Sequence, residues 1–143
     1  MKKPIIIKQA ESKDAKILAN LNVVVQNVHV NLFPNIFQKA NIPEITKIFR
    51  KWLNEKDTKA FIVYENNKPI AYMLLKIIKL DENVFMKKRA YINIDHICVD
   101  RNKRCQGIAK MLFKEAIKYS KDKKIPQIQL NVWSKNIAAV KAC

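Results

Sequence analysis

Residues 91–109 read YINIDHICVDRNKRCQGIA, and the expected architecture follows from this segment. Residues 91–99 have the alternating, β-branched content of a strand. Beyond Gly107, apolar side chains recur at helical spacing as far as Lys121. A strand that leads into a helix through a polar loop presents free backbone N–H groups at the helix N-terminus, where an anion can bind. The segment therefore predicts a phosphate-binding architecture.

Gly107 is the single glycine of the chain. A G-x-G-x-x-G dinucleotide fingerprint and a Walker A loop both need more than one glycine, so both are excluded. Glycine lets a backbone approach a ligand closely because it has no Cβ. The alternative interpretation is a glycine that only helps the helix to pack where it starts. The preceding strand, Arg104 and the amphipathic helix favour contact with a ligand.

A family resemblance rests on these residues. Residues 104–109, RCQGIA, match the Q/R-x-x-G-x-G/A signature of the GCN5-related N-acetyltransferases, the GNAT superfamily. Residues 94–100 resemble the fourth strand of that family, and residues 130–133 with Asn136 and Ala139 resemble its fifth strand and next helix. The likeness is good over about residues 60–143 and covers residues 1–59 only in the order of elements. It implies an α/β fold with a mixed, mostly antiparallel central sheet, helices on both faces, and a parallel strand pair that splays apart at the cofactor cleft.

The resemblance also implies acetyl-coenzyme A as cosubstrate, with no metal. In the family the pyrophosphate is held by loop N–H groups, here those of residues 105–109. The pantetheine arm lies between the splayed strands, and a backbone N–H near Ile97 or Val99 polarises the thioester carbonyl. The cofactor-binding residues expected on this basis are Ile97, Cys98, Val99, Arg104, Cys105, Gln106, Gly107, Ile108, Ala109, Asn131 and Asn136.

The implied reaction is direct transfer of an acetyl group to a primary amine of an unidentified acceptor. A lysine-like amine with a pKa of about 10.4 is neutral only about once in 2,500 molecules at pH 7, a penalty of roughly 4.6 kcal/mol. A general base offsets part of this penalty. Asp95 and His96 are the candidate catalytic residues, because both lie in the middle of the strand that should reach the cleft.

Both candidates have alternatives. Asp95 could be a structural carboxylate. Successive strand residues face opposite sides, so without a bulge only one of Asp95 and His96 can face the acceptor. Cys98 lies two residues after His96, a spacing that suggests a cysteine nucleophile activated by histidine. A small, buried structural cysteine is the favoured interpretation.

The sequence departs from the family at its end. After Asn136 and Ala139 the family usually carries Phe-Tyr and a final strand, and the tyrosine donates a proton to coenzyme A. Ala142 and Cys143 occupy those two positions here. The tyrosine acid and the last strand are therefore expected to be missing, with weak catalysis as a consequence. A truncated reading frame, an artificially shortened chain and a strand supplied by another chain remain open.

The remaining elements follow from hydrophobic periodicity. The expected elements are a strand at 5–8, a helix at 13–31 capped by Ser12, an apolar loop at 32–37, a helix at 43–53, strands at 60–65 and 68–78 joined by Asn66 and Asn67, a loop at 81–89, and parallel strands at 91–99 and 127–133. In the family the region of residues 13–56 forms the acceptor side of the cleft. Phe33 and Phe37 could line a pocket there or pack into the core.

Length and composition favour an ordinary globular domain. The 143 residues are 49% hydrophobic and fit a single acetyltransferase domain spanning residues 1–143. The apolar run at the start is too short for a signal peptide, and no stretch is long enough for a membrane span. The cysteines, Cys98, Cys105 and Cys143, are odd in number and lack C-x-x-C spacing, which disfavours disulfides and zinc. A cytoplasmic location is expected.

The formal charge is +16, and its lysines are scattered along nearly every expected element. That distribution favours a solvated surface that attracts a polyanionic cofactor over a dedicated nucleic-acid face. The expected partner is a small-molecule or peptide amine, and polyamines are less favoured because the positive charge would repel them. No specific nucleic acid and no membrane are expected as partners. A homodimer is left open. The alternative function is a non-catalytic module that binds acyl-coenzyme A or a polyanion.

Overall fold

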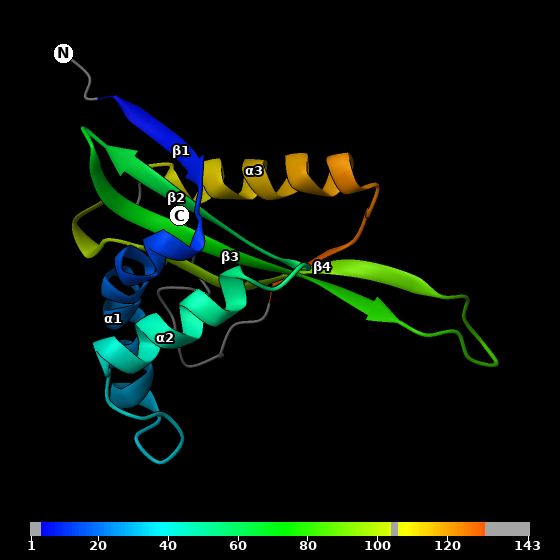
Figure 1. Cartoon of the computed structure of the whole chain (residues 1–143), viewed down its shortest axis with the longest axis horizontal. Helices are drawn as coiled ribbons and strands as arrows, with labels where there is room; N and C mark the ends of the chain where they lie inside the picture. The colour runs from blue at the N-terminus through cyan, green and yellow to red at the C-terminus, as the bar shows by residue number, and fades with distance from the viewer. Residues whose placement is uncertain (1–3, 104–105, 131–143) are drawn as a thin grey trace.

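A computed structural model describes residues 4–103 and 106–130 of the chain. Within them, five strands form one sheet in the order β1-β2-β3-β4-β5, and every neighbouring pair is antiparallel except the parallel pair β4–β5 (Figure 1). The strands are β1 Ile5–Gln9, β2 Thr58–Glu65, β3 Lys68–Leu80, β4 Arg89–Val99 and β5 Ile128–Leu130. The helices are α1 Ala15–Leu32, α2 Ile42–Leu53 and α3 Ile108–Lys123, with short 3-10 turns η1 Ser12–Asp14 and η2 Arg101–Lys103.

The helices cover both faces of the sheet, as predicted: α1 and α2 lie on one face and α3 lies on the other (Figure 1). Alternation along β3 explains the two cores that result. Met73 and Leu75 pack with Leu112 of α3, whereas Tyr72 and Leu74 pack on the opposite face against α1 and α2. A strand buried on both faces reads as a continuous apolar run, which is what residues 70–75 show.

The hairpin between β2 and β3 is confirmed. Asn66 and Asn67 join the strands with φ values of 51° and 66°. Asparagine tolerates the left-handed region better than most residues, so this pair suits the tight turn.

The starts of α1 and α2 differ from the prediction. Ser12 is not the N-cap of α1, because η1 begins at Ser12 and the α-helix begins at Ala15. The backbone N–H of Glu11 donates to Asp14 Oδ2 at 2.9 Å, so Asp14 stabilises this first turn. Helix α2 begins one residue before the predicted Pro43, and the Asn41 side chain caps it by accepting from the Glu44 N–H at 3.2 Å.

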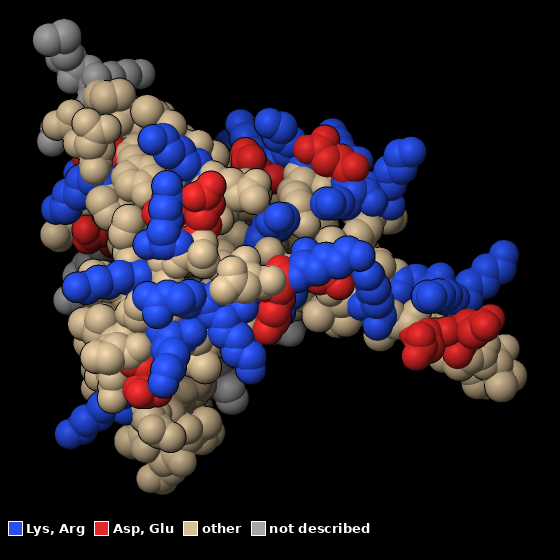
Figure 2. Space-filling view, viewed as in Figure 1, with Lys and Arg blue, Asp and Glu red and all other residues tan. Residues whose placement is uncertain are grey.

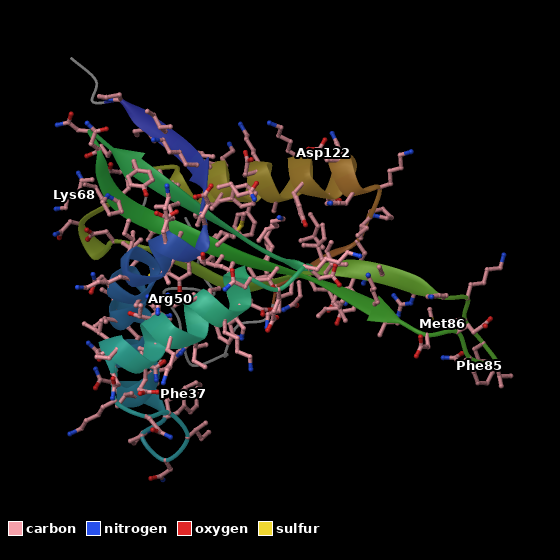
Figure 3. All side chains as sticks on the ribbon, in the orientation of Figure 1. Phe37, Arg50, Lys68, Phe85, Met86 and Asp122 are labelled. Atoms are coloured by element: carbon pink, nitrogen blue, oxygen red, sulfur yellow. The ribbon has the colours of Figure 1, made fainter. Side chains whose placement is uncertain are left out.

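Strands β3 and β4 continue past the rest of the sheet as a two-stranded arm (Figure 1). The side chains of Val84 and Phe85 at its tip are 95% and 94% exposed. Figure 3 shows Phe85 and Met86 at the far end of the arm, away from the helices. The Asn83 side chain accepts from the N–H groups of both residues, at 2.8 and 2.9 Å, so the tip is an ordered turn.

Candidate active site

A β-bulge lies at the centre of the predicted site. In the pairing of β3 with β4, Leu74 is opposite His96 and Leu75 is opposite Ile94, so Asp95 is the extra residue of β4. An extra residue reverses the alternation of side chains beyond it. Ile94 accordingly packs on the α3 face, whereas His96 contacts α2 on the opposite face.

The bulge brings Asp95 and His96 to the same face of the sheet. Asp95 reaches Lys76 of β3, whose ammonium lies over the Trp52 ring of α2. In an unbroken strand Asp95 and His96 would face opposite sides of the sheet. Because β4 carries the bulge, both can face the same side.

His96 is enclosed by aromatic rings. The ring centroids of Phe49, Trp52 and Tyr72 lie 5.8, 5.9 and 6.1 Å from that of His96. Burial lowers the pKa of His96 below its ordinary value, and the nearby Asp95 carboxylate opposes that shift. The imidazole is therefore neutral at pH 7.

A hydrogen-bond chain that begins in the core orients His96. The Asn22 amide of α1 donates from Nδ2 to Tyr72 Oη at 2.9 Å, and Tyr72 Oη lies 3.0 Å from His96 Nδ1. Burial raises the pKa of Tyr72 well above its ordinary value, so the phenol keeps its proton. Because Oη already accepts from Asn22, its O–H is the group that satisfies Nδ1. This assignment places the imidazole proton of His96 on Nε2.

Asp95 has a different environment. Its Oδ2 is 3.6 Å from Lys76 Nζ, and its Oδ1 accepts a hydrogen bond from the Asn93 amide. Lys76 Nζ is also 4.7 Å from the centroid of the Trp52 ring. The Lys76 and Asp95 side chains are 27% and 23% exposed, so solvent or a ligand can reach this pair.

Residues 97–99, after the bulge, are firmly packed. Cys98 is buried, and its thiol donates to the Leu21 carbonyl of α1 at 3.0 Å. This is the environment of a buried small residue, as favoured from the sequence. The side chains of Ile97 and Val99 pack on the α3 face. Any role of residues 97–99 in holding a ligand would therefore fall to the backbone.

The turn after β4 is fixed by polar contacts. The Asp100 N–H donates to the Ile70 carbonyl at 2.8 Å, and Asp100 Oδ1 accepts from the Asn102 N–H at 3.0 Å. Lys103 Nζ is 2.7 Å from Glu65 Oε1 at the end of β2. These contacts hold the chain in place just before the predicted cofactor loop.

Gly107 is the residue at the N-cap of α3, with φ +80° and ψ 8°. A Cβ placed on Gly107 would meet no atom within 4 Å among the described residues, so packing does not account for the glycine. The left-handed conformation favours glycine there, and no described atom fills the space that a ligand would need. Ile108 is buried and anchors the helix start, while Gln106 and Gly107 are exposed and Ala109 is half-buried. Arg104 and Cys105 lie outside the described residues.

The parallel pairing of β4 with β5 is confirmed. Ile92 is opposite Ile128 and Ile94 is opposite Leu130. Asn131, Asn136, Ala139, Ala142 and Cys143 lie outside the described residues, as does any splaying of the two strands beyond Leu130.

Sequence reasoning missed the residues that support Asp95 and His96. One signal was present for Lys76, which interrupts the apolar run of β3 between Leu75 and Ile77. A charged residue at such a position needs a partner or access to solvent. Asn22 and Tyr72 gave no comparable signal, because they are 50 positions apart.

Phe33 and Phe37 form a half-buried group at the end of α1. Their ring centroids are 6.1 Å apart, and the Phe37 ring is 4.6 Å from that of His29. Neither residue belongs to the two buried clusters. Figure 3 shows Phe37 beside α1 and α2, on the side of the molecule away from α3.

The described residues contain no group of three or more His, Cys, Asp or Glu side chains placed to hold a metal ion. Among the helices of the described ranges, none combines the length and apolar character needed to cross a membrane. Basic side chains are spread over the visible face of the molecule, including α2, α3 and the arm (Figure 2).

The sequence matches the model of the acetyltransferase (GNAT) family over residues 8–143. The chain belongs to this family. No curated protein matches the sequence. A solved structure with a similar fold is the tetramutant of the BH1408 protein from Bacillus halodurans, with 25% identity, a TM-score of 0.87, and coverage of 95% of this chain and 88% of that one.

Two further solved structures of similar fold contain acetyl-CoA or CoA. One is a predicted acetyltransferase from Clostridium acetobutylicum with acetyl-CoA, at 22% identity and a TM-score of 0.73, covering 92% of this chain and 83% of that chain. The other is the aminoglycoside N-acetyltransferase AAC(6')-Iy in complex with CoA, at 15% identity and a TM-score of 0.74, covering 99% of this chain and 85% of that chain. Membership of the GNAT family supports acyl transfer as the chemistry of this chain.

Proposed function

We propose that this GNAT protein transfers the acetyl group of acetyl-coenzyme A directly to a primary amine. The observation that carries the proposal is Gly107, which has φ +80° at the N-terminus of α3, after the turn that follows β4, the strand that bears Asp95 and His96. The first N–H groups of a helix have no partner within the helix, and they form an anion site with the helix dipole.

The cofactor would lie along the turn and β4. Backbone N–H groups of residues 105–109 would hold the pyrophosphate, with Arg104 and Gln106 assisting. The backbone of Ile97, Cys98 and Val99 would face the pantetheine and thioester portions, with Asn131 and Asn136 as further contacts. The exposed position of Gly107 and Gln106, and the open space beside Gly107, fit this arrangement.

Asp95 is the proposed general base. It is partly exposed, and the bulge turns it to the face covered by α1 and α2. His96 is the second catalytic candidate, in a different role. Its Nδ1 is engaged by Tyr72, so its Nε2–H is a hydrogen-bond donor in the resting protein. We therefore assign proton removal from the amine to Asp95, and positioning of acceptor or carbonyl oxygen to His96.

Isothermal titration with acetyl-coenzyme A tests the loop. The variants Gly107→Asp and Gly107→Asn form a matched pair, since both side chains have similar shape and both tolerate φ > 0 better than most residues. Gly107→Asp should abolish binding because a carboxylate would occupy the anion site, while Gly107→Asn should weaken it less. Equal binding by wild-type protein and Gly107→Asp would overturn the placement of the cofactor.

Turnover is measured separately, as release of coenzyme A thiol in the presence of a panel of primary amines. The panel should include aminoglycosides, peptide N-termini and lysine peptides. Asp95→Asn should lower kcat by about 10²-fold or more while leaving acetyl-coenzyme A binding in place. A variant with unchanged kcat would remove Asp95 from the role of base.

The net charge of +16 favours a second candidate, a non-catalytic module that binds acyl-coenzyme A or another polyanion. Binding to duplex DNA would then fall steeply with salt and survive Gly107→Asp. If the affinity for duplex DNA is no higher than that of an unrelated protein of equal charge, DNA binding is excluded as this alternative function.

A further inference from the structure

Lys76 presents a primary amine to the proposed catalytic base. Its Nζ is 3.6 Å from Asp95 Oδ2 and 4.7 Å from the centroid of the Trp52 ring. A carboxylate beside an aromatic face is a set of groups that recognises an ammonium ion. The site beside Asp95 is thus occupied by the chain's own lysine.

The lysine is also placed to reach the proposed thioester position. Lys76 is opposite Asn93 in the β3–β4 register, and its side chain extends along β4 to Asp95. Of Ile97 and Val99, the two residues whose backbone N–H is expected to polarise the thioester carbonyl, Ile97 is the nearer, two strand positions beyond Asp95, or about 7 Å. The flexible four-carbon stem of lysine allows a movement of a few ångströms.

We propose that Lys76 is an acetylation site of the protein itself, modified within the same molecule by bound acetyl-coenzyme A. The inference rests on the proposed function. The Lys76 ammonium loses a proton to Asp95, and neutral Nζ attacks the acetyl carbonyl carbon. The C–N bond forms, the C–S bond breaks, and coenzyme A leaves as the thiolate. The nitrogen then loses its second proton as it becomes an amide, and the thiolate takes up that proton to give the thiol. The proton on Asp95 passes to solvent.

The modification would change the site. An acetylated lysine has no positive charge, so the ion pair with Asp95 and the cation–π contact with Trp52 would both be lost. The carboxylate would then be available to the amine of an external acceptor.

Lys79 provides a matched comparison. It lies on the same strand and also forms an ion pair, 3.4 Å from Asp57 Oδ2, but its side chain is 58% exposed whereas that of Lys76 is 27% exposed. Uncatalysed chemical acetylation favours the more exposed amine. Faster modification of Lys76 than of Lys79 would therefore identify a reaction directed by the site.

The experiment incubates the full chain with isotopically labelled acetyl-coenzyme A and measures labelled acetyl groups at each lysine by mass spectrometry. The initial rate at Lys76 should exceed that at Lys79 at least about tenfold. This threshold is conservative, because a positioned general base typically accelerates a reaction by about 10²-fold or more. The rate constant should not depend on protein concentration, because the reaction is intramolecular. Gly107→Asp should abolish the difference between the two lysines.

Two carboxamide variants separate the role of the base from general reactivity. Asp95→Asn should slow labelling of Lys76 and leave Lys79 unchanged, whereas Asp57→Asn should leave Lys76 unchanged. Lys76→Arg keeps a cation beside Asp95 and should remove the labelled position.

The possible failures can be told apart. If acetyl-coenzyme A binds and an external amine is acetylated, but Lys76 is labelled no faster than Lys79, only the self-acetylation proposal is overturned. If titration shows no binding of acetyl-coenzyme A, both this proposal and the proposed function fail.

Discussion

The hydrogen-bond chain from Asn22 through Tyr72 to His96 determines what the histidine can do. The three residues come from α1, β3 and β4, so the chain also fixes the helix to the sheet. An imidazole that accepts at Nδ1 is held neutral with its proton on Nε2. Asp95 instead accepts from the Asn93 amide and pairs with Lys76. Two adjacent titratable residues therefore have different hydrogen-bond and ion-pair partners, which suits them to different roles in proton transfer.

Replacing Tyr72 with Phe tests this assignment. The hydrogen bond from the phenol stabilises neutral His96, so its loss should raise the pKa of His96. The buried Asn22 amide would also lose its acceptor, and the free energy of unfolding should fall by about 1–3 kcal/mol. NMR titration of the imidazole C–H signals measures the first effect and urea unfolding the second.

His29 is the internal control for that titration, since the chain has two histidines. Its pKa is lowered by burial, without a contribution from Tyr72, and should change much less in Tyr72→Phe. An unchanged or lower pKa of His96 in the variant would show that Nδ1–H donates to Tyr72, which reverses the tautomer.

At the level of elements, sequence patterns predicted the helices, the hairpin and the parallel pair, because each depends on periodicity or on a local turn. The bulge at Asp95 was not predicted, although a signal existed. Ile92, Ile94, Ile97 and Val99 all pack on the α3 face, and the spacing of three between Ile94 and Ile97 marks the extra residue. The regular spacing of two from Ile94 through His96 to Cys98 concealed the bulge, because it looks like an unbroken strand.

Parts of the site depend on contacts distant in sequence and could not be read from local pattern. Tyr72 and His96 are 24 positions apart, and Asn22 and Tyr72 are 50 positions apart. Gly107 was identified because it is the only glycine, and its positive φ gives the physical reason for its use. The start of α1 was misplaced because Ser12 and Asp14 are both plausible caps.

Helix α3 supports the predicted cofactor loop by packing, so one buried and one exposed residue on it should differ sharply. Leu112 is fully buried against β3 and β4, whereas Ile117 is 48% exposed. Leu112→Ala should lower the free energy of unfolding by about 2–5 kcal/mol, and Ile117→Ala by less than about 1 kcal/mol. Urea unfolding measures both. Similar losses for the two variants would mean that α3 does not pack on the sheet as described.

At the scale of the whole molecule, the spread of positive charge and the local contacts of a binding site have different effects on a ligand. The basic side chains are spread over the visible surface rather than gathered in one patch (Figure 2). The acidic pair Asp81 and Glu82 is exposed near the tip of the arm. A diffuse positive field attracts an anionic ligand over a distance, while the contacts that hold it are local. The association rate and the dissociation rate of an anionic ligand should therefore respond differently to salt.

The last prediction follows from that separation. Raising NaCl from about 0.05 to 0.5 M shortens the Debye length from roughly 14 to 4 Å, so the field of the net +16 charge decays much closer to the surface. The association rate of acetyl-coenzyme A should fall several-fold, whereas its dissociation rate should change less than about twofold. Stopped-flow fluorescence with a labelled coenzyme A analogue measures both rates. Lys87→Gln with Lys88→Gln, on the arm, serves as the control and should lower the association rate slightly without changing dissociation. If salt acts mainly on dissociation instead, the affinity depends on a few direct ion pairs at the loop, and the scattered lysines serve only to solvate the surface.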